Sequence, residues 1–301
     1  MKQIFGRILN IKRFEIHDGD GLRTTLFLKG CPLRCKWCHN PESLSTSAEL
    51  GYYEHKCISC GACVRICPYG AHSINGDVHT FDREKCVACG KCVSECLADA
   101  LVYYGESVTA AEVLPKLLED REFYKNSGGG DTLSGGEPLL QADFTCEVLK
   151  LLKKEGINTA VDTCLFASQS QLDKVIPFTD TFLVDVKAYN RDTHKELTGQ
   201  YNDVILENIR YLDFKGKDME IRIPFVPNQN SHEIEKIAEF LSTVGHLKGV
   251  RVLPYHNLSG NKYGSLDIEY SLNNSDTPIP TNEEAENARK ILESYGLKVL
   301  R

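Results

Sequence analysis

The sequence lacks any long hydrophobic run and has no excess of positive charge. No stretch approaches the roughly 20 apolar residues that a membrane-spanning helix needs, so we expect no membrane segment. The N-terminal segment, MKQIFGRILN, contains no long apolar run, so we also expect no signal peptide. The formal net charge of −7 argues against nucleic acid as a partner, because a polyanion would be repelled.

Cysteine, by contrast, is abundant. The chain has 13 cysteines among 301 residues, and all except Cys146 and Cys164 fall into three groups. Because no secretion signal is expected, clustered cysteines indicate metal ligands in a reducing cytoplasm rather than disulfides. We expect Cys146 to pack inside the protein. For Cys164, packing is the favoured interpretation and lining of a functional site is the alternative.

The three cysteine groups have the spacings of iron–sulfur ligands. The first has three thiols, so a four-iron cluster held there would keep one iron free for another ligand; its members are Cys31, Cys35 and Cys38. The others match the C-x2-C-x2-C-x3-C run of two-cluster ferredoxins, and comprise Cys57, Cys60, Cys63 and Cys67, then Cys86, Cys89, Cys92 and Cys96. Zinc in the first group would need a fourth ligand such as His39, and the neighbouring iron–sulfur spacings disfavour it.

The remaining chain alternates apolar strands with amphipathic helices, which predicts an α/β fold. Six strands are expected, at 23–29, 131–134, 158–162, 181–186, 219–225 and 249–254. Six β/α units form a partial TIM-like barrel, since a closed one needs about eight strands. Helix starts are predicted at the capping boxes Thr109-x-x-Glu112 and Thr281-x-x-Glu284, and at Asp143 and Ser231.

Residues 52–103 interrupt this alternation and contain both ferredoxin-type cysteine runs, each followed by a small strand. The two halves repeat, because CISCGACVRICPYGAHSI resembles CVACGKCVSECLADALVY. We therefore expect an inserted α+β, ferredoxin-like two-cluster domain at 52–103, within a barrel domain made of 1–51 and 104–301. Residues 257–280, rich in Asn, Ser, Gly and Pro, predict a surface loop.

Polar motifs follow the predicted strands, where the carboxyl ends of barrel strands gather at one mouth. Each has a simpler alternative: Asp185 and Lys187 could form a surface ion pair, and His256 could be a packing or surface group. Arg222 lies within an apolar strand, where an unpaired charge would be costly. The motifs are Ser134-Gly135-Gly136-Glu137-Pro138, Asp162-Thr163, Asp185-Val186-Lys187 and His256.

Nearly the whole chain resembles the activating enzymes of glycyl radical enzymes, within the radical S-adenosylmethionine superfamily. The resemblance rests on HDGDGLRTTLFLKGCPLRCKWCHNPES, SGGGDTLSGGEPLLQ, VDTC, FLVDVK, IRIPFVP and LPYHNLSGNKYG. It implies that the first cluster cleaves S-adenosylmethionine reductively, and that the 5′-deoxyadenosyl radical takes a hydrogen from a glycine of a partner enzyme. With a two-cluster insertion, the implied partner is a glycyl-radical dehydratase or C–X lyase.

The resemblance also implies cofactors and residue roles. The cofactors are three [4Fe-4S] clusters, S-adenosylmethionine and a monovalent cation, with electrons from a flavodoxin or ferredoxin-type donor. The cation would lie at Asp162 and Thr163, with Asp185 nearby, and the catalytic cluster would be held by Cys31, Cys35 and Cys38. S-adenosylmethionine would contact Trp37, Cys38, His39, Gly136, Asp185, Val186, Lys187 and His256.

Two residues depart from the family pattern. Asp20 replaces proline in the DGDG segment, and Asp131 follows the triple glycine where valine is usual. We expect Asp131 to face solvent at a strand edge, away from the mouth. Two other functions compete with the activating enzyme: a radical enzyme acting on a small molecule, and a ferredoxin-like electron carrier with a non-catalytic barrel. The carrier is disfavoured because it has no use for a three-cysteine site.

Overall fold

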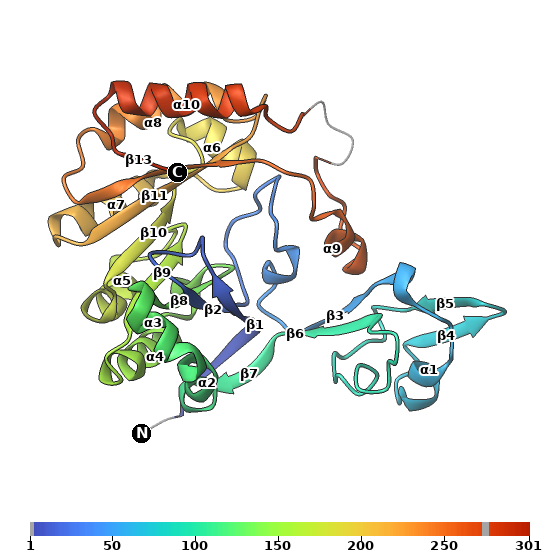
Figure 1. Cartoon of the computed structure of the whole chain (residues 1–301). Helices are drawn as coiled ribbons and strands as arrows, with labels where there is room; N and C mark the ends of the chain where they lie inside the picture. The colour runs from blue at the N-terminus through green and yellow to red at the C-terminus, as the bar shows by residue number, and fades with distance from the viewer. Residues whose placement is uncertain (1–2, 273–276) are drawn as a thin grey trace.

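The computed structural model describes residues 3–272 and 277–301 and has a large and a small part (Figure 1). In the described residues, the large part is built on a nine-stranded sheet with the order β13-β12-β11-β10-β9-β8-β2-β1-β7. The small part lies to the right in Figure 1 and is joined to the large one through a narrow two-stranded ribbon. The chain therefore has an α/β fold with one mixed sheet.

The central strands of the sheet are parallel and confirm the six predicted strands. They are mostly buried on both faces, which explains their nearly continuous apolar sequences. The sheet ends at β13 (Val299–Leu300) without returning to β7, an arrangement consistent with an open, partial barrel. The parallel strands are β2 (Arg23–Leu28), β8 (Gly130–Gly135), β9 (Asn158–Thr163), β10 (Thr181–Asp185), β11 (Asp218–Phe225) and β12 (Leu247–Pro254).

Two further strands at the other end of the sheet were not predicted. β1 (Phe5–Glu15) pairs antiparallel with β2 on one side and, through Phe5–Ile8, with the terminal strand β7 (Glu106–Thr109) on the other. The polar residues of β1 interrupt an apolar pattern, because β1 is largely exposed and β7 covers only its first part. These two strands close the edge of the sheet beside the place where the small part is inserted.

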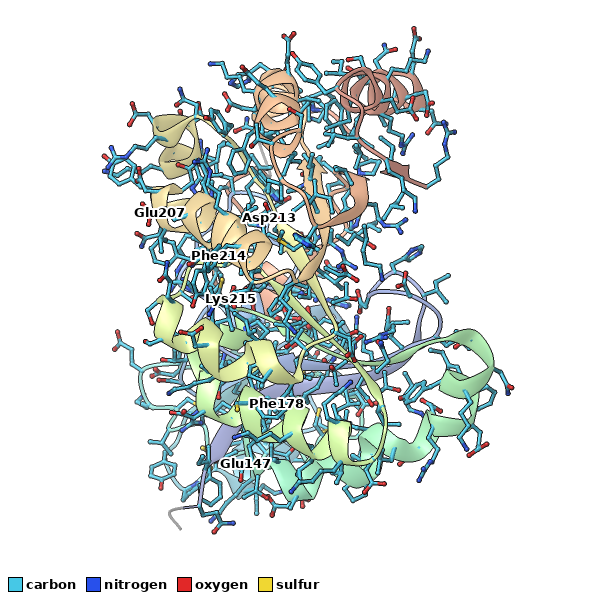
Figure 2. The ribbon with its side chains drawn as sticks, turned by 90° about the vertical axis from the view of Figure 1, so that its left-hand side faces the viewer. Glu147, Phe178, Glu207, Asp213, Phe214 and Lys215 are labelled. Carbon is cyan, nitrogen blue, oxygen red and sulfur yellow. The ribbon has the colours of Figure 1, made fainter. Side chains whose placement is uncertain are left out.

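Helices cover the outer face of the sheet, and Figure 2 looks directly onto this layer, with Glu147 on α4 and Glu207 on α7. Apart from α6, whose Leu197 packs in a separate cluster with Trp37, they pack their apolar sides on the strands in one large core that includes Leu26 and Leu133. The helices are α2 (Ala110–Leu117), α3 (Arg121–Ser127), α4 (Ala142–Lys154), α5 (Gln169–Val175), α6 (Arg191–Thr198), α7 (Asp203–Phe214), α8 (Ile234–Leu241) and α10 (Asn282–Ser294). Among the described helices, none combines the length and hydropathy needed to cross a bilayer.

The two predicted capping boxes are confirmed, whereas the caps predicted at Asp143 and Ser231 were wrong. Thr109 and Thr281 each accept a hydrogen bond from the backbone N–H three residues on. Asp143 and Ser231 are not caps, because short 3-10 turns lead directly into both helices. These turns are η4 (Pro138–Gln141), before α4, and η6 (Ser231–Glu233), before α8.

The small part is held by the ribbon of β3 (Glu49–Tyr52) and β6 (Leu101–Tyr104), which pair antiparallel. Beyond it lie α1 (Ala62–Ile66) and a hairpin of β4 (His72–Asn75) and β5 (Val78–Phe81). A strand follows each cysteine run, as predicted. The core is small, with Leu50, Cys92 and Leu101 buried at its centre.

The prediction of an irregular surface loop at 257–280 was wrong for its first part. Residues Gly260–Ser265 form a short helix, α9, and Tyr263 and Ser265 are buried. Composition alone suggested a loop, but the Tyr263 ring packs against other aromatic side chains. The section of the predicted loop at 273–276 lies outside the described residues.

The expectation that Asp131 faces solvent was also wrong. Its strand, β8, lies between β2 and β9 rather than at an edge, and Asp131 is fully buried. Oδ2 has no hydrogen-bond partner, and the Tyr124 hydroxyl lies 3.5 Å from Oδ1. Burial raises the pKa of Asp131 to about 8, although the charge of Arg23 opposes the shift.

This carboxyl should make stability depend on pH. Its pKa is raised from 3.8 to about 8 in the folded state. The favourable contribution of the protonated carboxyl to the free energy of unfolding is therefore complete below about pH 4 and is lost as the pH rises toward 8. Asp131→Asn removes the titration, so its free energy of unfolding should rise relative to the parent, by on the order of 1–3 kcal/mol between pH 5 and pH 8. Thermal or urea unfolding of the variant and the parent, at pH 5 and at pH 8, measures this difference in the free energy of unfolding.

The matched control is Asp192→Asn, which removes the same charge from an exposed position on α6. It should shift stability by a similar small amount at both pH values. If Asp131→Asn behaved like the control, the buried carboxyl would be fully ionised and compensated.

Candidate functional site

A cavity of about 440 Å³ opens at the carboxyl ends of the parallel strands. This volume lies within the roughly 300–1,000 Å³ typical of small-molecule sites. Val186 does not line it, because its side chain belongs to the apolar core and its N–H donates to the Arg222 carbonyl. All other residues proposed for the cofactor or the cation do: Cys31, Cys35, Trp37, Cys38, His39, Gly136, Asp162, Thr163, Asp185, Lys187 and His256.

The first cysteine loop is fixed against the end of α6. The backbone N–H of Arg34 donates to the Thr198 carbonyl at 2.7 Å, and that of Lys36 to the Leu197 carbonyl at 3.0 Å. Trp37 is buried in an apolar cluster with Leu197, and this cluster also contacts Cys35 and Cys38. The loop is therefore held in place by protein contacts, with its thiols toward the cavity.

The thiols of this loop are strongly desolvated. Burial raises the pKa of Cys35 to about 12 and that of Cys38 to about 11. Thiols in such surroundings stay protonated unless a cation replaces the proton, and metal ligation deprotonates a thiol outright. The hydrogen bond with Cys164 instead lowers the pKa of Cys31. Three partly buried thiols on one short loop fit an iron–sulfur cluster, whose positive iron atoms would stabilise the thiolates.

The double glycine is needed for a close backbone contact with this loop. Gly135 has a φ of +117°, and a Cβ on Gly136 would lie 2.2 Å from the Gly30 carbonyl oxygen. Gly136 N–H donates to the Leu28 carbonyl at 2.9 Å, and Glu137 N–H to the Gly30 carbonyl at 2.8 Å. The glycines therefore lock the end of β8 onto the residues just before Cys31.

Glu137 joins this segment to the end of β9. Its fully buried carboxylate accepts hydrogen bonds from the Thr163 hydroxyl at 2.8 Å and from the N–H groups of Leu139 and Cys164 at 2.9 and 2.8 Å. Burial raises the pKa of Glu137, while these hydrogen bonds oppose the shift. The carboxylate thus fixes two segments of the cavity wall.

The two cysteines outside the three groups differ in position. Cys146 is a packing residue, as expected, and its thiol donates to the Lys174 carbonyl at 3.0 Å. Cys164 is buried but also lines the cavity, so the packing interpretation was incomplete. A hydrogen bond with Cys31, together with burial, raises the pKa of Cys164.

Asp185 and Lys187 do form an ion pair, but in the cavity wall rather than on the open surface. Lys187 Nζ lies 2.8 Å from Asp185 Oδ2, and the Lys187 side chain is 10% exposed. Burial alone would lower the pKa of Lys187, but the charge of Asp185 outweighs it and raises the pKa. Lys187 is therefore a permanent cation available to an anionic ligand group.

Arg222 finds its anionic partners within the protein. Its guanidinium lies 3.5 Å from carboxylate oxygens of both Asp162 and Glu220, and 3.9 Å from Asp18. Asp162 also accepts a hydrogen bond from the Ser134 hydroxyl at 2.6 Å. Burial raises the pKa of Asp162 to about 7, against the charge of Arg222. A bound cation would favour the ionised carboxylate here.

A pair of stacked histidines forms another wall of the cavity. The rings of His39 and His256 are 4.0 Å apart and nearly parallel, and His39 Nε2 lies 3.1 Å from the His256 carbonyl. Behind them, Lys262 Nζ donates to the His39 carbonyl at 3.0 Å, and the Tyr263 hydroxyl to the Cys38 carbonyl at 3.0 Å. Lys262 and Tyr263 were missed as contacts of this loop, although both occur in the LPYHNLSGNKYG motif.

The cysteines of the small part fall into two spatial sets. One pocket is lined by Cys57, Cys60, Cys63 and Cys96. The thiols that act electrostatically on Cys92 include Cys86, Cys67 and Cys89. Each cysteine run thus places its last member with the other run, as in two-cluster ferredoxins. A competing ligand set is also present, because Cys63, His72 and His79 bring ligand atoms within 4.8 Å of one another.

Removing the Glu137 carboxylate should destabilise the cavity wall. Glu137→Ala leaves the N–H groups of Leu139 and Cys164 and the Thr163 hydroxyl without their acceptor, at a cost of roughly 2–5 kcal/mol. Urea unfolding measures the loss. Glu207→Ala, at an exposed position on α7 (Figure 2), is the control and should cost less than about 0.5 kcal/mol. Equal costs would mean that the buried carboxylate has no structural role.

Comparisons with known proteins agree with these features. Residues 25–241 match the Radical SAM superfamily. The chain is 38% identical to the trans-4-hydroxy-L-proline dehydratase activating enzyme of Clostridioides difficile, over 95% of this chain and 96% of that protein. It is 39% identical to the choline trimethylamine-lyase activating enzyme of Oleidesulfovibrio alaskensis, over 97% and 96%.

One solved structure shares the fold at low sequence identity. It is a radical SAM methyltransferase from Sphaerobacter thermophilus, with a TM-score of 0.51 and 15% identity over 97% of this chain and 76% of that one. The matched family and the near full-length relatives agree with the three-cysteine cavity. The chain belongs to the radical SAM superfamily and, within it, to the activating enzymes of glycyl radical enzymes.

Proposed function

We propose that this chain binds S-adenosylmethionine in the 440 Å³ cavity and uses it to abstract a hydrogen atom from a glycine of a partner glycyl radical enzyme. The observation that carries the proposal is the meeting of three elements in one cavity. These are the loop of Cys31, Cys35 and Cys38, the double-glycine segment, and the Asp185–Lys187 ion pair.

Different residues of the cavity would bind different parts of the cofactor. Bound to a four-iron cluster at the cysteine loop, S-adenosylmethionine supplies a 5′-deoxyadenosyl radical after one-electron reduction. Lys187 carries the positive charge that suits the carboxylate of the methionine part, and the backbone of Gly136 is open to its amino group. Trp37 and the stacked His39 and His256 offer flat rings beside the adenosyl part.

The carboxylates of Asp162 and Asp185, with Thr163, would hold a monovalent cation. Asp162 and Thr163 end β9, Asp185 ends β10, and all three line the cavity. Hard oxygen ligands of this kind suit such a cation. Its charge would offset the carboxylates that the Arg222 guanidinium and Lys187 only partly neutralise.

A glycine-bearing segment of a protein is the substrate favoured over a small molecule. The sheet does not close between β13 and β7, so the large part has an open side through which a peptide could reach the cavity. The relatives named above activate a dehydratase and a lyase. A dehydratase or C–X lyase of the glycyl radical class is accordingly the proposed partner.

The small part would carry two further four-iron clusters and receive electrons from a flavodoxin or ferredoxin-type donor. In the proposed ligand sets, Cys57, Cys60 and Cys63 share a cluster with Cys96, and Cys86, Cys89 and Cys92 share the other with Cys67. The pocket around the first set and the neighbours of Cys92 support this crossed arrangement.

Crossed ligation predicts which variants alter the same cluster. The anaerobically reconstituted chain should hold about twelve iron atoms in three clusters. In EPR spectra of the reduced protein, Cys96→Ala should perturb the signal that Cys60→Ala perturbs, and Cys67→Ala the signal that Cys89→Ala perturbs. Pairing of Cys96 with Cys89 would show uncrossed sets. About four irons with zinc in the remainder would point to the Cys63, His72 and His79 set instead.

The function is tested by mixing the reduced, reconstituted chain with S-adenosylmethionine and candidate glycyl radical dehydratases and lyases. The expected result is the EPR doublet of a glycyl radical on the partner, with release of 5′-deoxyadenosine. Cys38→Ala should abolish both, whereas Cys146→Ala, a buried cysteine outside the cavity, should retain them. Cofactor cleavage coupled to a small-molecule product, without any glycyl signal, would favour the small-molecule alternative.

A further inference from the structure

Arg83, which precedes the second cysteine run, makes one of the contacts between the small part and the large part. Arg83 NH1 donates to the Leu50 carbonyl of β3 at 2.8 Å, and NH2 donates to the Ser265 carbonyl at the end of α9. Its guanidinium also lies 5.0 Å from the centre of the Phe81 ring. The acceptors are carbonyls of two separate segments, so Arg83 fastens α9 to the base of the ribbon.

The same short helix reaches the first cysteine loop on its other side. Tyr263 packs in the aromatic cluster that contacts Cys35 and Cys38, and its hydroxyl donates to the Cys38 carbonyl at 3.0 Å. Lys262 Nζ donates to the His39 carbonyl at 3.0 Å and pairs with Glu42 at 2.6 Å. α9 is thus a bridge of six residues between Arg83 and the loop of the catalytic cysteines.

The two cysteine sets of the small part are not equivalent with respect to this bridge. The Cys86 N–H donates to the Arg83 carbonyl at 3.2 Å, within a single turn. Cys92 is buried beside Leu50, and the Leu50 carbonyl accepts a hydrogen bond from Arg83. Cys57 and Cys63 instead contact His79 on β5, and the β4–β5 hairpin with α1 forms the far end of the small part in Figure 1. Both sets reach the ribbon, because Cys63 and Cys96 also pack against the cluster of Leu50 and Cys92, but the Cys86 run is the one whose backbone is bonded to Arg83.

We propose that Arg83 and α9 are positioning elements that hold the Cys86, Cys89, Cys92 and Cys67 set against the Cys38 loop, so that electrons reach the catalytic cluster from this set. A reduced flavodoxin-type donor would lose one electron and so be oxidised by one electron. That electron would pass through the small part and reduce the cluster held by Cys31, Cys35 and Cys38 by one electron. The Cys57 set lies farther out on this route. The inference rests on the proposed function for its cofactors but not on the identity of the partner.

The experiment follows electron arrival in the reconstituted chain without any partner enzyme. Wild type, Arg83→Gln and the control Lys85→Gln are mixed with reduced flavodoxin and frozen at intervals for EPR. The first-cluster signal is identified by its absence in Cys38→Ala. Lys85 is exposed and directly precedes Cys86, and its ammonium group forms an ion pair with Asp82. The Lys85→Gln change therefore removes the same charge as Arg83→Gln without removing a contact with α9.

Reduction of the first cluster by flavodoxin should be several-fold slower in Arg83→Gln than in Lys85→Gln, with equal iron content. Dithionite, which reaches the first cluster directly, should reduce both equally. Hydrogen exchange should rise at residues 260–266 in Arg83→Gln alone. Tyr263→Phe keeps the ring and loses the hydrogen bond to the Cys38 carbonyl, so it should also slow the reduction of the first cluster by flavodoxin.

Equal flavodoxin rates in Arg83→Gln and Lys85→Gln would overturn the proposal. So would a Cys60→Ala variant that blocks reduction of the first cluster while Cys89→Ala does not, provided both retain the other clusters. Because no glycyl radical is measured, a chain that passes electrons as expected but activates no partner would contradict the proposed function alone.

Discussion

The close contact between Gly136 and the backbone of Gly30 is the constraint on which the site depends. A side chain at Gly136 would separate the two segments, since its Cβ would meet the Gly30 carbonyl oxygen at 2.2 Å. With the segments in contact, Glu137 can place its carboxylate under the end of β9 and bind Thr163 and Cys164. The cysteine loop, the glycine segment and the end of β9 are thereby fixed as one rigid wall, which is how a preorganised site is built.

Charge burial is the main cost of this arrangement, and the fold meets it by pairing. Arg222 would be expensive alone in β11, yet carboxylates from β9, its own strand and the DGDG loop surround it. Lys187 is balanced by Asp185 in the same way. Such groups keep fixed charges in a largely buried cavity wall, where fixed charges act more strongly than they do in water. Asp131 lacks such a complete shell, and its Oδ2 is unpaired.

The features that sequence could predict are those coded locally. Short runs of four to seven residues identified the six parallel strands, and cysteine spacing predicted three groups of ligands, because both patterns occur within one segment. The features that were missed depend on contacts between distant segments. Asp131 is buried because β2 and β9 flank its strand, and Tyr263 is buried because aromatic side chains from elsewhere surround it. β1 has a mixed pattern because it is largely exposed and β7 pairs only with its first part.

The small part can be inserted without disturbing the sheet because its entry and exit are held together. β3 and β6 pair antiparallel, so the chain leaves and returns at neighbouring points before β7 rejoins the sheet. Lys29, fully buried between β2 and Cys31, donates to the Glu42 carbonyl at 2.7 Å and pairs with Glu49 at 2.6 Å. The residue that follows β2 therefore fastens β3 at Glu49, while Arg83 fastens the same strand to α9 through the Leu50 carbonyl. Two anchors on adjacent residues of a narrow ribbon restrict rotation of the small part, which the proposed electron transfer requires.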